Sequence, residues 1–316
     1  MIDQHGREIN YLRLSITERC SLRCTYCRAG EGHCPKKKEL SATELVRIVR
    51  VMARHGITKV RVTGGEPMLR HDLLDIIAGI HAIDSIQEIN LTTNAQHLQG
   101  QAAALKSAGL SRLNISLDSL REDRYADMTG GGSLAAVLSG MDEALRAGFS
   151  PVKLNAVLLR GVNDDEMKDF VELTKDKPVD MRFIELMPMG DTNTDDKRIG
   201  GDEILTAFPM LIPVRKRYKG QPANDYQMPG YTGRVGLINA ISHRFCDQCN
   251  RIRVMSDGML RPCLGQNAEV LLTPSLMQKD DSALIKSIRE AIYHKPACHG
   301  FGEGFSSKKD MSRIGG

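Results

Sequence analysis

The alternation of short apolar runs with longer amphipathic segments constrains the fold of this chain more than any other feature. Runs rich in β-branched and aliphatic residues are each followed by a segment with the period of an amphipathic helix, about six times in all. The expected strands cover residues 12–16, 59–63, 88–92, 113–117, 152–158 and 181–186. Strands and helices in this order, with short connections, predict an α/β fold with a parallel sheet and crossover helices.

Residues typical of helix ends lie between these strands. Ser41 followed by Glu44 predicts a capping box, and Gly56 ends the helix that it opens. Further helices are expected from residue 72 to about 80 and over 97–108, 133–147 and 164–175. After residue 187 the rhythm changes to loops rich in Asp, Pro and Gly, with a short helix near 202–208. We therefore expect a barrel unit over residues 1–210 and a smaller C-terminal region over 211–316.

Three cysteines, Cys20, Cys24 and Cys27, follow the first expected strand within one short loop. Their spacing lets the loop point all three sulfurs at one centre, and thiolates suit iron–sulfur clusters or zinc. A four-iron cluster normally takes four cysteines, so three would leave one iron open to another ligand. Such an open position is typical of catalytic metal sites. A structural zinc site is the alternative.

The run Gly64-Gly65-Glu66-Pro67 follows the second expected strand. Without the cysteines, its double glycine would indicate only a tight turn. Together, the two motifs resemble the radical S-adenosylmethionine (SAM) superfamily. This resemblance narrows the fold to an incomplete, TIM-like (β/α)6 barrel. Because glycine has no side chain, we expect the backbone at Gly64 and Gly65 to approach the methionine part of SAM closely.

A second cysteine group, Cys246, Cys249 and Cys263, lies in the C-terminal region. Asp257-Gly258 predicts a hairpin turn that folds Cys263 back toward the other two cysteines. A structural zinc ribbon with Cys298 as the fourth ligand is the alternative for this segment.

Composition limits the partners. The chain has 316 residues, 41% of them hydrophobic, enough for a sizeable core. It has no run of eighteen apolar residues and no apolar signal segment at its start, so we expect a cytoplasmic location and no membrane partner. In such a chain, cysteines more often bind metal than form disulfides. A net charge of +4 with 4% aromatic residues does not indicate nucleic acid, but allows an anionic small substrate.

The two cysteine groups together, with the sequence Cys249-Asn250-Arg251-Ile252-Arg253, resemble the GTP 3′,8-cyclase family of molybdenum cofactor biosynthesis over nearly the whole chain. The resemblance implies two 4Fe–4S clusters, one binding SAM and one contacting GTP. A 5′-deoxyadenosyl radical would remove hydrogen from C3′ of GTP, and C3′ would then bond to C8, giving 3′,8-cyclo-7,8-dihydro-GTP. It also implies a homodimer whose product passes to cyclic pyranopterin monophosphate synthase.

The same resemblance implies a set of site residues. The contacts to SAM would be Tyr26, Gly65, Ser116 and Met187. The contacts to GTP would be Arg13, Arg61, Thr92, Lys153, Arg251, Ile252 and Arg253. Catalysis would depend on Arg13, Arg251, Arg253, Gly315 and Gly316.

Residue types support part of this set. Arg13 and Arg61 stand within otherwise aliphatic strands, where an anionic ligand would offset the cost of burying a charge. A solvated strand edge or a salt bridge is the alternative. Gly65, Ser116 and Met187 fall at or just past strand ends, where barrel enzymes build their active sites.

The chain ends in Gly315-Gly316. A terminal glycine pair usually frays, whereas the resemblance implies that this pair reaches into the active site. One departure from the family pattern is Arg28-Ala29 in place of the usual Met-Pro. Cys34 and Cys298 are assigned no role.

Two other functions remain as alternatives. The first is a two-cluster radical SAM enzyme that modifies a peptide, with the second cluster passing electrons. The second is a zinc-stabilised binding module.

Overall fold

The computed structural model describes residues 1–27, 38–189, 195–278, 281–301, 305, 307 and 309–316. Within these residues, no helix combines the length and the apolar character needed to cross a membrane.

Six parallel strands pair in chain order and form the body of the barrel. They are β1 (Tyr11–Ser15), β2 (Lys59–Thr63), β3 (Glu88–Thr93), β4 (Arg112–Ser116), β5 (Val152–Val157) and β6 (Val179–Ile184). All six overlap the predicted strands, and no end differs from its predicted position by more than two residues. The predicted incomplete (β/α)6 barrel is therefore confirmed.

The C-terminal region extends this sheet at both edges. Beyond β6 lie β9 (Val235–Ile238), β8 (Asn224–Gln227) and β7 (Ile212–Val214), and only β9 is parallel to its inner neighbour. Beyond β1 lie β10 (Arg251–Val254), parallel to β1, then β11 (Met259–Arg261) and β12 (Val270–Leu271), both antiparallel. Among the described residues, one twelve-stranded sheet thus runs through both regions.

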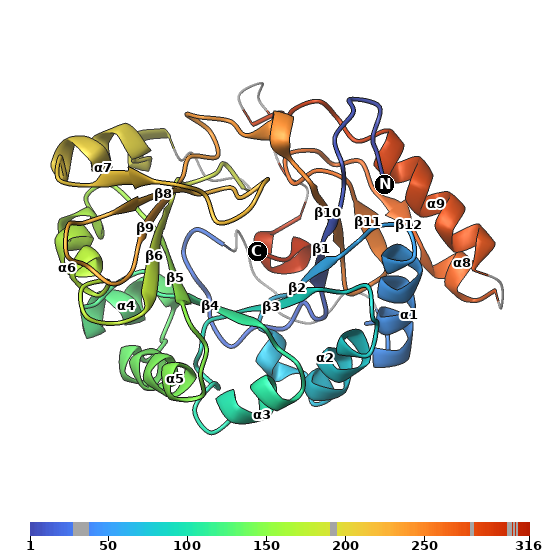
Figure 1. Cartoon of the computed structure of the whole chain (residues 1–316), viewed down its shortest axis with the longest axis horizontal. Helices are drawn as coiled ribbons and strands as arrows, with labels where there is room; N and C mark the ends of the chain where they lie inside the picture. Colours follow the sequence, from blue (N-terminus) through green and yellow to red (C-terminus); the bar gives the residue numbers. More distant parts are fainter. Residues whose placement is uncertain (28–37, 190–194, 279–280, 302–304, 306, 308) are drawn as a thin grey trace.

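Helices surround the strands, as Figure 1 shows. They are α1 (Ala42–Ala53), α2 (Leu73–His81), α3 (Ala102–Ser107), α4 (Glu122–Thr129), α5 (Leu134–Arg146), α6 (Met167–Glu172), α7 (Gly201–Ala207), α8 (Thr273–Leu276), α9 (Ser282–Tyr293) and α10 (Met311–Ile314). The capping box at Ser41 and Glu44 is present. The sequence did not predict α4, and α3 is shorter than expected. The last helix, α10, lies inside the ring of strands (Figure 1).

Successive strand residues face opposite sides of the sheet, and in this barrel the two sides differ sharply. The outward residues are aliphatic and buried against the helices, as Leu12, Leu14, Val60 and Val62 are. The inward residues are mostly polar: Tyr11, Arg13, Ser15, Lys59, Arg61, Thr63, Asn90, Thr92, Asn114, Ser116, Lys153, Asn155 and Arg182. Closed eight-stranded barrels usually fill this space with branched apolar residues. A polar interior instead suits a charged ligand.

Candidate functional site

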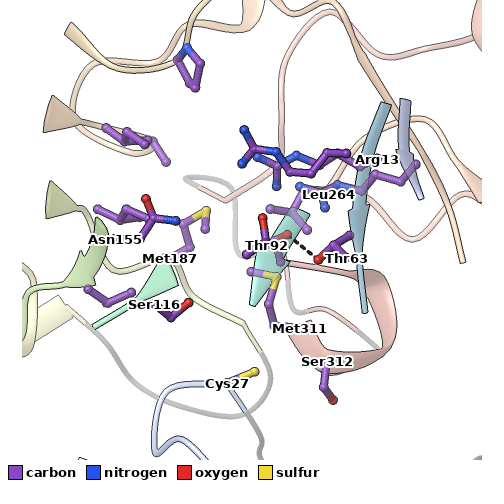
Figure 2. A pocket seen from close by; sticks show the side chains of 18 of the residues that line it. Arg13, Cys27, Thr63, Thr92, Ser116, Asn155, Met187, Leu264, Met311 and Ser312 are labelled. Carbon is purple, nitrogen blue, oxygen red and sulfur yellow. Dashed lines mark hydrogen bonds between the residues drawn. The ribbon is translucent and has the colours of Figure 1, made fainter. Parts of the chain in front are cut away.

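A cavity of about 320 Å³ occupies the interior of the barrel. Strand residues, both cysteine groups and the last residues of the chain all line it. Figure 2 shows Arg13 from β1, Thr92 from β3 and Asn155 from β5 turned toward this common space. Cys27 and the C-terminal residues Met311 and Ser312 border it as well.

The two cysteine groups lie at opposite ends of the barrel. Cys20 follows the end of β1, so the first group lies at the carboxyl ends of the parallel strands. Cys249 instead precedes Arg251, the first residue of β10, which pairs with Tyr11 at the start of β1. Cys263 follows β11. Because β11 runs antiparallel to β10, the chain returns to the end of the barrel where Cys249 lies, and Cys263 lies there too. The polar interior therefore separates the two groups.

In the first group, Tyr26 stands between two cysteines and is tied to the barrel. Its hydroxyl donates to Oδ2 of Asp118 at 2.6 Å, and Oδ1 of Asp118 accepts from the backbone N–H of Val157 at 2.9 Å. Burial raises the pKa of Asp118 to about 6. Burial, and then the nearby Asp118, also raise the pKa of the Cys24 thiol. Because bound iron favours thiolates, a cluster would lower that thiol pKa.

The double glycine lies against the segment that leads to Cys20. The N–H of Gly65 donates to the carbonyl of Thr17 at 2.8 Å, and that of Glu66 to the carbonyl of Arg19 at 2.7 Å. A Cβ on Gly65 would collide with the Arg19 carbonyl. The absence of side chains at these glycines therefore makes room for the segment before Cys20. They line the cavity, but the space where their side chains would be is filled by residues 17–19.

Glu66 is fully buried beside this turn and joins it to the end of β3. Its carboxylate accepts from the Thr93 hydroxyl at 2.8 Å, the Asn94 N–H at 2.7 Å and the Met68 N–H at 2.9 Å. Burial outweighs these bonds and raises the pKa of Glu66 to about 7. Asn94 in turn directs Nδ2 toward the Cys20 sulfur at 3.8 Å, so the glutamate steadies a neighbour of the first cysteine group.

In the second group, the β10–β11 hairpin turns at Gly258 and confirms the predicted fold-back of Cys263. Gly258 has a φ of +83°, which favours glycine. Burial raises the pKa of the Cys249 thiol, but the charges of Arg251 and Lys295 outweigh it, so that the pKa falls to about 6. This environment favours the thiolate that an iron ligand must provide.

The donor sets fit iron–sulfur clusters. Each end of the cavity offers three thiols and open space, and thiolates are the usual protein ligands of such clusters. In the described residues, no group of three or more His, Cys, Asp or Glu side chains is arranged to hold a single metal ion. A 4Fe–4S cluster is a larger body whose ligands bind separate iron corners, so its three thiolates stay further apart than ligands of one ion.

Between the two ends lies a layer of buried cations. Among the described residues, Nε of Arg13, Arg61 and Arg182 is buried without a hydrogen-bond partner. Burial, and then the neighbouring Arg251, lower the pKa of Arg253 to about 9. Like charges held close together are costly to bury, and a polyanion placed among them would offset that cost.

Most predicted site residues meet in this cavity. Those that line it are Arg13, Tyr26, Arg61, Gly65, Thr92, Ser116, Met187, Arg251, Arg253, Gly316 and the six cysteines. Lys153 is buried on the same face of β5 as Asn155 but is not part of the lining. Ile252 is fully buried in the hydrophobic core with Leu12, so its side chain points away from the cavity. Arg28-Ala29 and Cys34 lie outside the described residues.

The C-terminal tail is bound inside the barrel. The Thr63 hydroxyl donates to the carbonyl of Gly316 at 2.9 Å, and Nη1 of Arg253 donates to the carbonyl of Gly315. Arg313 pairs with Glu18 at 3.1 Å. Gly315 has a φ of +85°, and a Cβ there would lie 2.8 Å from Cγ2 of Thr63. The fraying that is usual for a terminal glycine pair therefore does not occur.

Several cavity residues were not predicted from the sequence. Arg182 and Asn155 contribute charge and amide groups from β6 and β5, and Asp118 holds Tyr26. A signal for the strand residues was present. A polar residue at every second position of an otherwise apolar strand marks the inward face, and Arg182 within Met181-Arg182-Phe183 fits this pattern.

Comparison with known proteins agrees with this architecture. Residues 14–174 match the Radical SAM superfamily, and residues 179–301 match the family described as Molybdenum Cofactor Synthesis C. Streptococcus suis SuiB bound to S-adenosylmethionine has a similar fold, with a TM-score of 0.63 and 15% identity over 96% of this chain and 69% of that chain. A zinc-stabilised binding module does not account for these matches.

Curated relatives match over the full length. The chain is 46% identical to the GTP 3′,8-cyclase of Alkaliphilus oremlandii over 100% of both chains. It is 42% identical to the GTP 3′,8-cyclase of Petrotoga mobilis, again over 100% of both, and 42% identical to that of Listeria monocytogenes over 99% of this chain and 98% of that one. The chain therefore belongs to the GTP 3′,8-cyclase family of the radical SAM superfamily.

Proposed function

We propose that this protein converts GTP to 3′,8-cyclo-7,8-dihydro-GTP, the first step of molybdenum cofactor biosynthesis. The observation that carries the proposal is a single cavity that joins two cysteine triads through a layer of arginines. Residues 1–210 would carry the SAM-binding triad, and residues 211–316 the second triad and the C-terminal tail.

Cys20, Cys24 and Cys27 would hold a 4Fe–4S cluster with one iron open to SAM. When bound and reduced, this cluster and SAM together supply a 5′-deoxyadenosyl radical. Tyr26, Gly65, Ser116 and Met187 would hold SAM at the carboxyl ends of the strands, where all four line the cavity.

GTP would lie between the triads. Arg13, Arg61 and Arg253 would bind its triphosphate, because guanidinium groups form paired hydrogen bonds with phosphate oxygens. Arg182 lines the same space and would join them. Lys153 lies just behind the cavity lining, and its positive charge would attract the triphosphate from there.

Cys246, Cys249 and Cys263 would hold the second 4Fe–4S cluster and present it to the guanine base. Arg251 follows Cys249 closely and lines the cavity, so it would bridge this cluster and the substrate. Gly315 and Gly316 would complete the wall around the ribose, because Arg253 and Thr63 hold them within the barrel.

The test is anaerobic. The full chain is reconstituted with iron and sulfide, reduced, and mixed with SAM, and 5′-deoxyadenosine is measured with GTP, with ATP and without nucleotide. We expect a large increase with GTP only, together with a product of the mass of GTP. Equal 5′-deoxyadenosine in all three reactions would contradict the proposed substrate while leaving SAM cleavage in place.

A peptide substrate is the competing reading, and the bound tail argues against it. Gly315 and Gly316 already occupy the part of the cavity between β1 and β2, bonded to Arg253 and Thr63. A peptide would have to displace these bonds and would leave the buried arginines without an anion.

We further propose that the enzyme acts in the cytoplasm as a homodimer and passes its product to cyclic pyranopterin monophosphate synthase. Sedimentation of the reconstituted protein tests the dimer. A coupled assay with that synthase, in which product is consumed only when both proteins are present, tests the handover.

A further inference from the structure

Lys295 follows α9 in a short segment, residues 295–299, that lies against the second cysteine triad. At one end of the segment, the Lys295 ammonium donates to the carbonyl of Pro262, the residue before Cys263. At the other end, the backbone N–H of His299 donates to the Cys246 sulfur. The segment therefore contacts the triad at Cys246 and holds Pro262, the residue next to Cys263.

The charge of Lys295 is buried without a carboxylate. Lys295 is only 2% exposed, and it lines the cavity. Within the part of the chain that the structure describes, no acidic group lies in ion-pair range of it, and its hydrogen bond goes to a neutral carbonyl. A buried ammonium is costly unless negative charge lies nearby.

Arg7 provides an instructive contrast at the same triad. It also reaches the cysteine loop, donating to the carbonyls of Cys246 at 2.9 Å and Ala297 at 2.7 Å. Its charge, however, is matched by Asp3, whose Oδ2 lies 2.7 Å from Nε. Arg7 thus holds the loop in place while Asp3 neutralises its charge. Among the described residues, the charge of Lys295 has no such carboxylate beside it and can act on the cysteine thiolates.

We propose that Lys295 positions Cys263 for the second cluster and that its charge raises the reduction potential of that cluster. A reduced cluster carries one more negative charge than the oxidised cluster. A buried cation beside its ligands therefore stabilises the reduced form more, and net charge is one of the terms that set such potentials. The inference rests on the proposed second cluster.

The experiment uses the full chain with both clusters reconstituted. Lys295→Met removes the charge at similar length, Lys295→Arg keeps it, and Lys286→Met removes an exposed charge from α9 as the control. The measurement is a potentiometric titration followed by electron paramagnetic resonance. The second cluster is recognised by a spectral change on adding GTP that disappears in a Cys249→Ser variant.

For Lys295→Met, we expect the equilibrium for reducing the second cluster to fall at least tenfold, which for one electron is about 59 mV. In Lys295→Arg and Lys286→Met, the reduction potential of the second cluster should stay near the wild-type value. The reduction potential of the first cluster should not change in any variant. A wild-type potential in Lys295→Met with full iron content would overturn the inference. A wild-type chain that holds only one cluster would instead overturn the proposed function on which it rests.

Discussion

The hydroxyl of Tyr26 donates to Oδ2 of Asp118 at 2.6 Å, so the barrel wall directly fixes a side chain of the loop that carries the first cysteine triad. The other carboxylate oxygen accepts from the N–H of Val157. Asp118 thus joins the loop to the ends of β4 and β5.

Asp118→Asn should weaken SAM binding. An asparagine can keep the bond from Val157 through its oxygen, but its amide nitrogen cannot accept the Tyr26 proton. A lost hydrogen bond of this kind costs about 1–1.5 kcal/mol, or about tenfold in the dissociation constant of SAM. Equilibrium binding to the reconstituted protein measures it. Tyr26→Phe should show a similar loss, and the double variant no more than either alone. Additive losses would contradict the role given to this pair.

Gly315→Ala should impair the GTP-dependent reaction but not SAM cleavage without GTP. The alanine methyl would meet Cγ2 of Thr63 at 2.8 Å and would force an L-residue to a φ of +85°. We expect GTP-dependent 5′-deoxyadenosine to fall by about tenfold or more, because strain of about 1–3 kcal/mol would displace the tail. An alanine at Gly131, also at positive φ but with nothing within 4 Å of its Cβ, is the matched control. Equal losses in both would contradict a role for the tail.

Serine substitutions should separate the two triads. Cys24→Ser should abolish SAM cleavage, whether GTP is present or not. Cys249→Ser should leave SAM cleavage without GTP but remove its stimulation by GTP, because that residue lies at the opposite end of the cavity. Iron and sulfide analysis should show about half the wild-type content in each variant. Loss of all SAM cleavage in Cys249→Ser, with the first cluster intact, would contradict this separation.

The stability of the ligand-free chain should rise with pH above neutrality in part because of Lys153. Burial, and then the nearby Arg182, lower the pKa of Lys153 from 10.5 to about 7. Between these two values the unfolded chain binds a proton that the folded chain has released, so stability increases with pH in that window. Lys153→Met should flatten the increase in melting temperature from about pH 7 to pH 10 relative to wild type. Lys286→Met is the control, and parallel wild-type and Lys153→Met curves would contradict the prediction.

The six central strands could be predicted because their signal is local. Each is a short aliphatic run followed by a helix, and β2 matches its predicted bounds at Lys59–Thr63. The outer strands were harder to predict because β9 and β10 are only four residues each and gain their partners from tertiary pairing. No local pattern says that Arg251 pairs with Tyr11, far away in the chain.

The site could be predicted where a short motif carries it. The six cysteines and Gly65 follow from spacing and resemblance, and the structure brings them to one cavity. Asp118 could not be found in this way, since its role depends on meeting Tyr26 from a distant strand end. Ile252 illustrates the reverse case, in which the resemblance implied a contact to GTP for a residue whose side chain lies outside the cavity. It stands between two cavity arginines, and the alternation of a strand turns its side chain into the core.

The pairing of β1 with β10 and the tail bonded to Thr63 also set an order of events during protein synthesis. The first strand emerges from the ribosome early, yet one of its edges has no partner until residue 254 has followed. Gly316 can reach Thr63 only after the more than 250 residues between them have been made. A nascent chain can therefore display its first cysteine loop while the cavity is still open on the side of β10, and the cavity is completed only after residues 251–316 have been added.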